Sequence, residues 1–184
     1  MLKIGFFGTP ELSASVLRGL LENENFSVEF AVTNPDKKFG RAQTLIASPV
    51  KQLAESYQIP VFQPEKIRNN TEFLAKIAEY QCDYFVVVAY GKILPKELLE
   101  IPKKMCINVH GSILPKYRGA SPIQSALLNG EKETGVTIMQ MSEGMDEGAM
   151  ICVAKITISP NETSVSLFEK FAEVSPNALI DGIL

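Results

Sequence analysis

Short apolar runs alternate with segments of helical periodicity through most of this 184-residue chain, and this alternation constrains the fold more than any other feature. The clearest runs lie at residues 2–7, 26–33, 59–62 and 84–89. A run that is apolar on both faces is typical of a buried parallel strand, and neighbouring parallel strands need a connection of helix length. The pattern therefore predicts a parallel sheet with right-handed helical crossovers.

The segments between the runs carry helix signals. Thr9 and Pro10 predict a cap and a first turn for a helix to about residue 22, and Ser48 and Pro49 do the same for a helix to about residue 57. Further helices are expected at 70–80, 94–99, 122–128 and from 164 onward. We expect Pro176 to break or bend the last of them.

Two long β-rich segments, 134–141 and 149–158, are separated only by the loop 142–148. Such close spacing predicts an antiparallel hairpin. The expected fold is therefore α/β: a Rossmann-like, open, mostly parallel sheet with an antiparallel hairpin near the C-terminal end. The turn after the first strand has one glycine and no G-x-G-x-x-G pattern, so the sequence gives little support for an NAD site.

Composition narrows the function classes. The net charge of −3 leaves no overall basic footprint, so any contacts with nucleic acid would have to be local. We expect Cys82, Cys106 and Cys152 to be small buried residues in a reducing compartment, because their wide spacing forms no metal pair. The start of the sequence has no signal-peptide pattern and no apolar run reaches membrane-spanning length, so we expect a cytoplasmic protein with no membrane partner.

Polar side chains gather at the end of the strand expected at 106–110. Strand side chains alternate between faces, so Ile107 and Val109 share one face while Asn108 and His110 share the other. Open α/β sheets bind ligands at the carboxyl ends of their strands. His110 is the only histidine in the chain. Taken alone, it also fits an ordinary structural histidine.

Asp146 lies in the glycine-flanked loop of the expected hairpin, where aspartates are also common as turn residues. If the loop folds over the strand end, Asn108, His110 and Asp146 converge. Asn108 and His110 could then stabilise a tetrahedral oxyanion, and Asp146 could orient His110, favour its cationic form and relay a proton. Which group is the base stays open. One histidine cannot make a multi-histidine metal site, and no metal is expected.

The run from Asn108 to Gly119, Asn-x-His-x-Ser-x-Leu-Pro-x-Tyr-Arg-Gly, resembles the signature of folate-dependent formyltransferases. Segments at 7–10, 34–36, 48–51, 88–95 and 133–139 are similar to those of methionyl-tRNA formyltransferases, so the resemblance covers essentially the whole chain. It implies that residues 1–184 form a formyltransferase catalytic domain. It also implies transfer of a formyl group from 10-formyltetrahydrofolate to the methionine amino group of initiator methionyl-tRNA.

The same resemblance assigns roles to residues. Asn108, His110 and Asp146 match the family's catalytic positions. The residues expected to contact the folate donor are Tyr90, Gly91, Ser112, Ile113, Leu114, Pro115 and Met139.

The stretch from residue 34 to 47 is expected to be irregular, and it is longer than an ordinary connection. The resemblance implies that it approaches the tRNA acceptor end through Lys37, Lys38 and Arg41; no DNA partner is expected. After the arginine the family usually continues Gly-Lys-Lys-Leu, whereas this chain has Ala-Gln-Thr-Leu at 42–45. From its length alone the stretch also fits a solvated excursion. The family carries a C-terminal tRNA-binding β-barrel domain, which we expect in the full-length protein.

Two other interpretations stay open. Formyltransferases that act on an amino sugar nucleotide or on glycinamide ribonucleotide share the Asn-x-His pair and the aspartate loop. The segments 40–41 and 48–51 favour tRNA, and a purine-pathway enzyme would normally place a second histidine before the aspartate. A non-catalytic folate- or nucleotide-binding module is the alternative from a different class. The intact Asn108, His110 and Asp146 argue against it.

Overall fold

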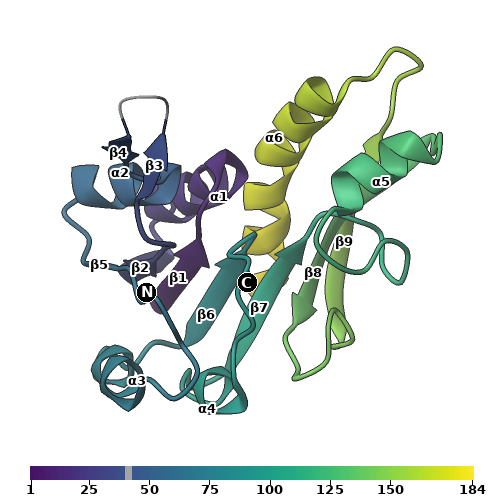
Figure 1. The fold of residues 1–184 in the computed structure, drawn as a ribbon. Coiled ribbons are helices and arrows are strands. Elements are labelled where there is room, and N and C mark those ends of the chain that lie inside the picture. The colour runs from purple at the N-terminus through teal and green to yellow at the C-terminus, as the bar shows by residue number, and fades with distance from the viewer. Residues whose placement is uncertain (40–42) are drawn as a thin grey trace.

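A computed structural model describes residues 1–39 and 43–184, and its main feature is a seven-stranded sheet with helices on both faces (Figure 1). The strands of this sheet are β1 (Leu2–Gly8), β2 (Phe26–Val32), β5 (Val61–Phe62), β6 (Tyr84–Val88), β7 (Met105–His110), β8 (Glu133–Gln140) and β9 (Met150–Thr157). The helices are α1 (Glu11–Leu21), α2 (Pro49–Ser56), α3 (Thr71–Ala78), α4 (Lys96–Leu99), α5 (Pro122–Leu128) and α6 (Ser164–Ile183).

The strand order in the sheet is β5-β2-β1-β6-β7-β8-β9. All neighbours from β5 to β7 pair in parallel, whereas β8 pairs antiparallel with both β7 and β9. The expected open, mostly parallel sheet with a C-terminal antiparallel hairpin is therefore confirmed.

The sheet separates two apolar cores because its buried strands send alternate side chains to opposite faces. Phe6 of β1 lies in the core formed with α1, α2, α5 and α6, and its neighbour Phe7 lies in the core formed with α3 and α4. In β7 the same rule sends Ile107 and Val109 into the first core. Asn108 and His110 therefore lie on the α3–α4 face, as expected from the alternation.

The stretch from 34 to 47 is not wholly irregular, and that expectation was wrong. It contains β3 (Lys37–Phe39) and β4 (Thr44–Ile46), which pair antiparallel with Lys38 opposite Leu45. The pairing joins backbone donors and acceptors of the two arms, which a solvated loop would leave to water. The two strands project beyond α2, away from the main sheet (Figure 1).

The two expected helix starts have different outcomes. Ser48 caps α2 as expected, because its Oγ accepts a hydrogen bond from the Lys51 N–H at 3.1 Å. Thr9 does not cap α1, which begins after Pro10 without a side-chain cap. The Thr9 hydroxyl instead accepts hydrogen bonds from the backbone and side-chain nitrogens of Asn34, at 3.3 and 3.1 Å.

Helix α6 runs through Pro176 from Ser164 to Ile183, so the proline does not break it. The helix packs against α1, where Gly19 faces the proline. A Cβ atom on Gly19 would lie 2.6 Å from the Pro176 Cβ, which is closer than side-chain atoms approach in proteins. Packing of α6 on α1, β8 and β9 outweighs the hydrogen bond that the proline cannot make.

The cysteines are free thiols. Cys82 and Cys106 are buried, which raises the pKa of each to about 12, whereas Cys152 is only partly buried. No helix in the described part of the chain is long and apolar enough to cross a membrane.

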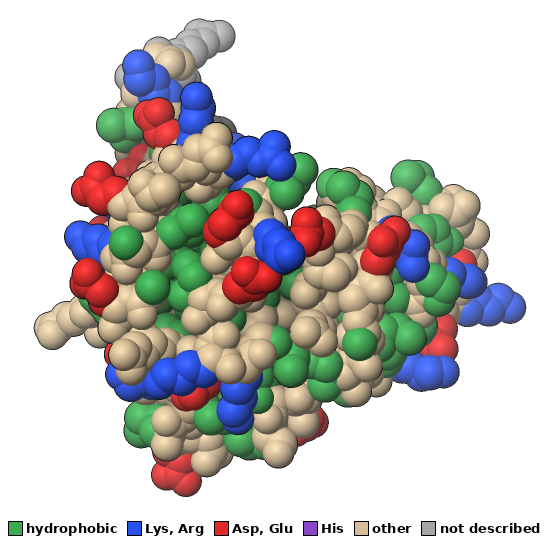
Figure 2. All heavy atoms as spheres, turned by 90° about the horizontal axis from the view of Figure 1, so that it is seen from below, with side chains coloured by type: hydrophobic (Ala, Val, Ile, Leu, Met, Phe, Trp, Pro, Cys, Tyr) green, Lys and Arg blue, Asp and Glu red, His purple; other side chains and the backbone are tan. Residues whose placement is uncertain are grey.

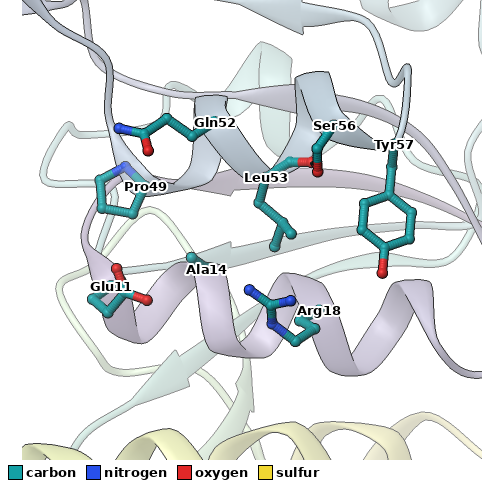
Figure 3. A pocket seen from close by; sticks show the side chains of 8 residues that line it. All are labelled: Glu11, Ala14, Arg18, Pro49, Gln52, Leu53, Ser56 and Tyr57. Atoms are coloured by element: carbon teal, nitrogen blue, oxygen red, sulfur yellow. Dashed lines mark hydrogen bonds between the residues drawn. The ribbon is translucent and has the colours of Figure 1, made fainter.

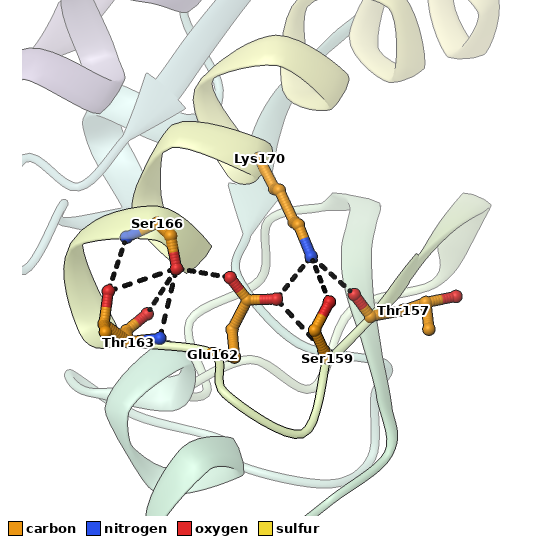
Figure 4. Close-up of polar contacts among 6 residues, drawn as sticks. All are labelled: Thr157, Ser159, Glu162, Thr163, Ser166 and Lys170. Carbon is orange, nitrogen blue, oxygen red and sulfur yellow. Dashed lines mark hydrogen bonds and ion pairs between the residues drawn. The ribbon is translucent and has the colours of Figure 1, made fainter.

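Glu162 links the end of β9 to the first turns of α6 (Figure 4). Its carboxylate accepts hydrogen bonds from Lys170 Nζ, from Ser166 Oγ and from the Ser159 N–H. The hydrogen bond from Lys170 contributes most to lowering the pKa of Glu162 to about 2. The charged form of the Glu162 carboxylate therefore stabilises the turn between β9 and α6.

We expect Gly19→Ala to destabilise the protein by about 1–3 kcal/mol, because the new methyl group would collide with Pro176. In an ordinary helix the same change stabilises by about 1 kcal/mol. Chemical denaturation provides the measurement. Ser15→Ala on the same helix is the control and should stay within about 0.5 kcal/mol of wild type. A Gly19→Ala protein as stable as wild type would contradict the close helix contact.

Glu162 should make stability depend on pH in a defined window. Its pKa is about 2 when folded and close to 4.3 when unfolded, so its stabilising effect is complete above about pH 4.5 and fades as pH falls toward 2. The difference in unfolding free energy between wild type and Glu162→Gln should shrink over that range. Glu173→Gln, at an exposed site on the same helix, is the control for removing one carboxylate. A Glu162→Gln difference that is constant from pH 7 to 2.5 would refute this assignment.

Candidate active site

The three predicted catalytic side chains come from β7 and from the loop that joins β8 to β9. Because β8 is antiparallel to β7, Gln140 lies opposite Ile107, and the loop 141–149 begins beside the first half of β7. The Met141 N–H donates to the Cys106 carbonyl at 2.8 Å, and the loop then folds over the α3–α4 face of the strand. Asp146 reaches β7 in this way, with a left-handed backbone at φ +52° that aspartate tolerates better than most residues.

Asn108, His110 and Asp146 are brought together. Asn108 Nδ2 donates to Asp146 Oδ1 at 3.4 Å, and His110 Nδ1 lies 3.6 Å from Asp146 Oδ2. The histidine and aspartate side chains are only 6% and 14% exposed. At that exposure both side chains are largely shielded from water.

Backbone groups of the segment after β7 complete the contacts of His110 and Asp146. The Tyr117 carbonyl lies 2.9 Å from His110 Nε2, and the Gly119 N–H donates to Asp146 Oδ2 at 2.8 Å. Sequence reasoning missed both contacts, since a backbone group leaves no signal in residue identity.

The Tyr117 contact decides where His110 carries hydrogen. A carbonyl oxygen only accepts, so Nε2 must be the donor. In the neutral ring Nδ1 would then be a bare lone pair facing the Asp146 carboxylate. A hydrogen between Nδ1 and Oδ2 would remove that repulsion, so the geometry suits proton relay between the two side chains. Asn108 keeps a second amide N–H for another acceptor, because only one is needed for Asp146.

The residues expected to contact folate occupy several environments. Gly91 and Pro115 are exposed, and Gly91 has φ +78° with open space where a Cβ would be. Tyr90 is 2% exposed, and its hydroxyl has no hydrogen-bond partner among the residues that the structure describes. The remaining residues are buried or partly buried: Ser112, Ile113, Leu114 and Met139. Their role in donor binding stays a prediction.

Two of the three residues expected to contact tRNA lie on β3. Lys37 and Lys38 are exposed on β3, and Arg41 lies outside the described residues. On the face seen in Figure 2, lysine and arginine side chains stand beside aspartate and glutamate rather than forming one basic field. That mixture agrees with the net charge of −3.

A polar network anchors the base of the hairpin, and sequence reasoning did not find it. Asp36 accepts from Lys51 Nζ and Gln63 Nε2, both at 2.7 Å. Asn34 Nδ2 donates to Thr9 Oγ1 at 3.1 Å and to the Tyr90 carbonyl at 2.8 Å. The Lys51 hydrogen bond contributes most to lowering the pKa of Asp36, and it raises the pKa of Lys51. The hairpin is thus tied to residues that follow β1, β5 and β6.

Two surface hollows lie away from the three side chains. The larger, about 450 Å³, opens between α1 and α2 and is lined by Arg18, Gln52 and Tyr57, among others (Figure 3). The smaller, about 240 Å³, is lined by Ile113, Lys116, Tyr117, Glu131, Glu133 and Thr134. Among the described residues, no group of three or more His, Cys, Asp and Glu side chains could hold a metal ion.

The fold and the site define an α/β protein whose polar groups at one strand suit proton-coupled transfer chemistry. The sequence model of the formyl transferase family matches residues 2–183, and the chain belongs to that family. It is 49% identical, over all of its length, to the methionyl-tRNA formyltransferase of Trichodesmium erythraeum, and spans 55% of that protein. It is 44% identical over 182 residues to the enzyme of the same name from Caldicellulosiruptor saccharolyticus, and spans 58% of it.

The fold is also that of a solved phosphoribosylglycinamide formyltransferase from Bacillus halodurans. The TM-score is 0.81 over 97% of this chain and 94% of that one, at 21% sequence identity. At this identity the likeness supports the shared fold and does not distinguish between substrates.

We expect Asp36→Asn to loosen the base of the β3–β4 hairpin, because the charged partner of the partly buried Lys51 is lost. Amide hydrogen exchange of residues 37–39 and 44–46 should accelerate about 3- to 10-fold, with the main sheet unchanged. The control is Glu100→Gln, which removes the well-exposed Lys96–Glu100 pair. Equal exchange in wild type and Asp36→Asn would show that the ion pair does not hold the hairpin.

Proposed function

We propose that the protein transfers a formyl group from 10-formyltetrahydrofolate to the methionine amino group of initiator methionyl-tRNA. The observation that carries this proposal is the convergence of Asp146 on Asn108 and His110, at distances of 3.4 and 3.6 Å, in a member of the formyl transferase family. The acceptor is proposed from the relatives, which are named methionyl-tRNA formyltransferases.

In the proposed reaction the uncharged amine attacks the formyl carbon. A C–N bond to the acceptor forms, the carbonyl oxygen becomes an oxyanion, and the bond to the folate nitrogen then breaks. The free N–H of Asn108 and a protonated Nδ1 of His110 are the donors for the oxyanion. The amine proton passes through the His110–Asp146 pair to the leaving nitrogen, so protons balance over the cycle.

His110 can serve the reacting groups only through Nδ1, because Nε2 is occupied by the Tyr117 carbonyl. Asp146 has one oxygen beside Nδ1 and the other beside the Asn108 amide. A substrate that enters between these groups therefore meets the Asn108 amide as donor, the Asp146 carboxylate as acceptor and His110 Nδ1 as proton carrier. The proposed catalytic residues are Asn108, His110 and Asp146.

The chain spans 55–58% of the length of these two relatives, so the partners of the whole protein are proposals as well. Residues 1–184 would form the catalytic domain, and the remainder of the full-length protein would help to hold tRNA. Lys37, Lys38 and Arg41 are the proposed local tRNA contacts. Tethering a tRNA-binding part to the site would raise the effective concentration of the acceptor end without changing the chemistry.

Exchanging the catalytic side chains tests the proposal. His110→Asn and Asp146→Asn should each lower the rate of formyl transfer by about two to four orders of magnitude. The measurement is transfer of labelled formyl from 10-formyltetrahydrofolate by the full-length protein to initiator methionyl-tRNA. Glu143→Gln, an exposed change in the same loop, is the matched control and should retain wild-type rate.

The acceptor is tested in the same assay with glycinamide ribonucleotide and an amino sugar nucleotide in place of tRNA. Transfer to either of these and none to tRNA would replace the proposed acceptor. Folate binding without transfer to any acceptor would favour the binding-module interpretation. Wild-type rates in both His110→Asn and Asp146→Asn would remove the catalytic assignment itself.

A further inference from the structure

The segment between β7 and α5 positions both His110 and Asp146 through its backbone. The Tyr117 carbonyl accepts from His110 Nε2 at 2.9 Å, and the Gly119 N–H donates to Asp146 Oδ2 at 2.8 Å. Whatever holds the backbone of this segment therefore also sets the geometry of the proposed catalytic pair.

The first half of the segment is fixed to the sheet. Thr137 of β8 is fully buried; its hydroxyl donates to the Ser112 carbonyl at 2.6 Å and accepts from the Leu114 N–H at 3.2 Å. The Ser112 hydroxyl donates to the Lys116 carbonyl at 2.6 Å. These contacts end one residue before Tyr117.

Tyr117 itself needs another restraint. Its backbone has φ +56°, a left-handed conformation that is unusual for an aromatic residue. Its hydroxyl donates to Glu131 Oε1 at 2.8 Å, and its ring packs against the core on the α5–α6 face. The tyrosine side chain is therefore fixed at its outer end by one carboxylate oxygen.

Glu131 lies in the turn between α5 and β8, outside the site. Its Oε1 also accepts from Lys116 Nζ at 2.9 Å, and this hydrogen bond contributes most to lowering the pKa of Glu131. Both partners, Lys116 and Tyr117, belong to the segment, so one charged carboxylate connects it to the turn before β8. The three residues line the 240 Å³ hollow, which contains none of the proposed catalytic side chains.

We infer that Glu131 is a positioning residue: it holds Tyr117 so that the Tyr117 carbonyl keeps hydrogen on Nε2 of His110. Asp146 acts in the opposite sense, because a carboxylate beside Nδ1 favours hydrogen there. Without the Tyr117 carbonyl the neutral ring would place its single hydrogen on Nδ1, against Asp146. The contribution to catalysis rests on the proposed function, whereas the effect on the histidine tautomer does not.

The first test observes the tautomer directly by nitrogen NMR of ¹⁵N-histidine in the full-length protein, across about pH 6–9, where imidazole loses its charge. The His110 signals are assigned by their absence from His110→Gln. Neutral His110 should be the Nε2–H form in wild type and shift toward the Nδ1–H form in Glu131→Ala. Tyr117→Phe keeps the ring and removes only the hydroxyl, so it should give the same shift without loss of folding.

The second test separates positioning from binding. In Glu131→Ala and Tyr117→Phe, kcat for formyl transfer should fall about 10- to 100-fold while KM for the folate donor changes less than about 3-fold. Glu131→Gln should recover to within about 3-fold of wild type, because its side-chain carbonyl still accepts from the Tyr117 hydroxyl. Glu133→Gln is the matched control: Glu133 lines the same hollow, but its carboxylate pairs with Lys155 at 2.9 Å rather than with Tyr117.

The two tests fail in different ways. Wild-type tautomer signals in Glu131→Ala and Tyr117→Phe would overturn the inference, whether or not the rate changes. In another outcome the tautomer shifts in both variants while the wild-type protein transfers no formyl to any acceptor. That result would support the role of Glu131 and refute the proposed function. An equal rate loss in Glu133→Gln would show that the hollow matters as a whole, and the specific role of Glu131 would be wrong.

Discussion

The site depends first on the register of β7, which decides which of its side chains point to each face of the sheet. Ile107 and Val109 are buried in the core under α1, α5 and α6, and this burial forces Asn108 and His110 onto the opposite face. A shift of one residue would exchange the two sets and place an amide and an imidazole in an apolar core. The packing of two aliphatic side chains therefore fixes the orientation of the proposed chemistry.

The second requirement is the change of strand direction after β7. Because β8 runs antiparallel, the loop 141–149 starts beside the first half of β7 rather than beyond its end, and Asp146 approaches the face of the strand. Gly148 permits this path, since a Cβ there would lie 1.8 Å from the Gln140 carbonyl oxygen. The antiparallel direction of β8 is therefore required to bring Asp146 to Asn108 and His110.

Polar contacts near strand ends fix the β3–β4 hairpin and the segment before α5 to the main sheet. Asn34 bridges Thr9 and the Tyr90 carbonyl, and Asp36 joins Lys51, so the β3–β4 hairpin is tied to the same edge of the sheet. On the other side, Glu131 ties the segment before α5 to the turn before β8. Each tie joins segments that are separated in the sequence, and each adds a restraint on backbone near the site.

The sequence by itself determined the α/β fold, the order of the elements in the main sheet and the face of β7 on which Asn108 and His110 lie, because these follow from hydrophobic periodicity over a few neighbouring residues; it missed β3 and β4. It also placed Asp146 in a loop that could reach them. Only the tertiary structure decided that α6 continues through Pro176 against Gly19, that Thr9 accepts from Asn34 rather than capping α1, and that Tyr117 and Gly119 act through their backbones. These are contacts between distant segments and main-chain atoms, and local pattern carries no record of them.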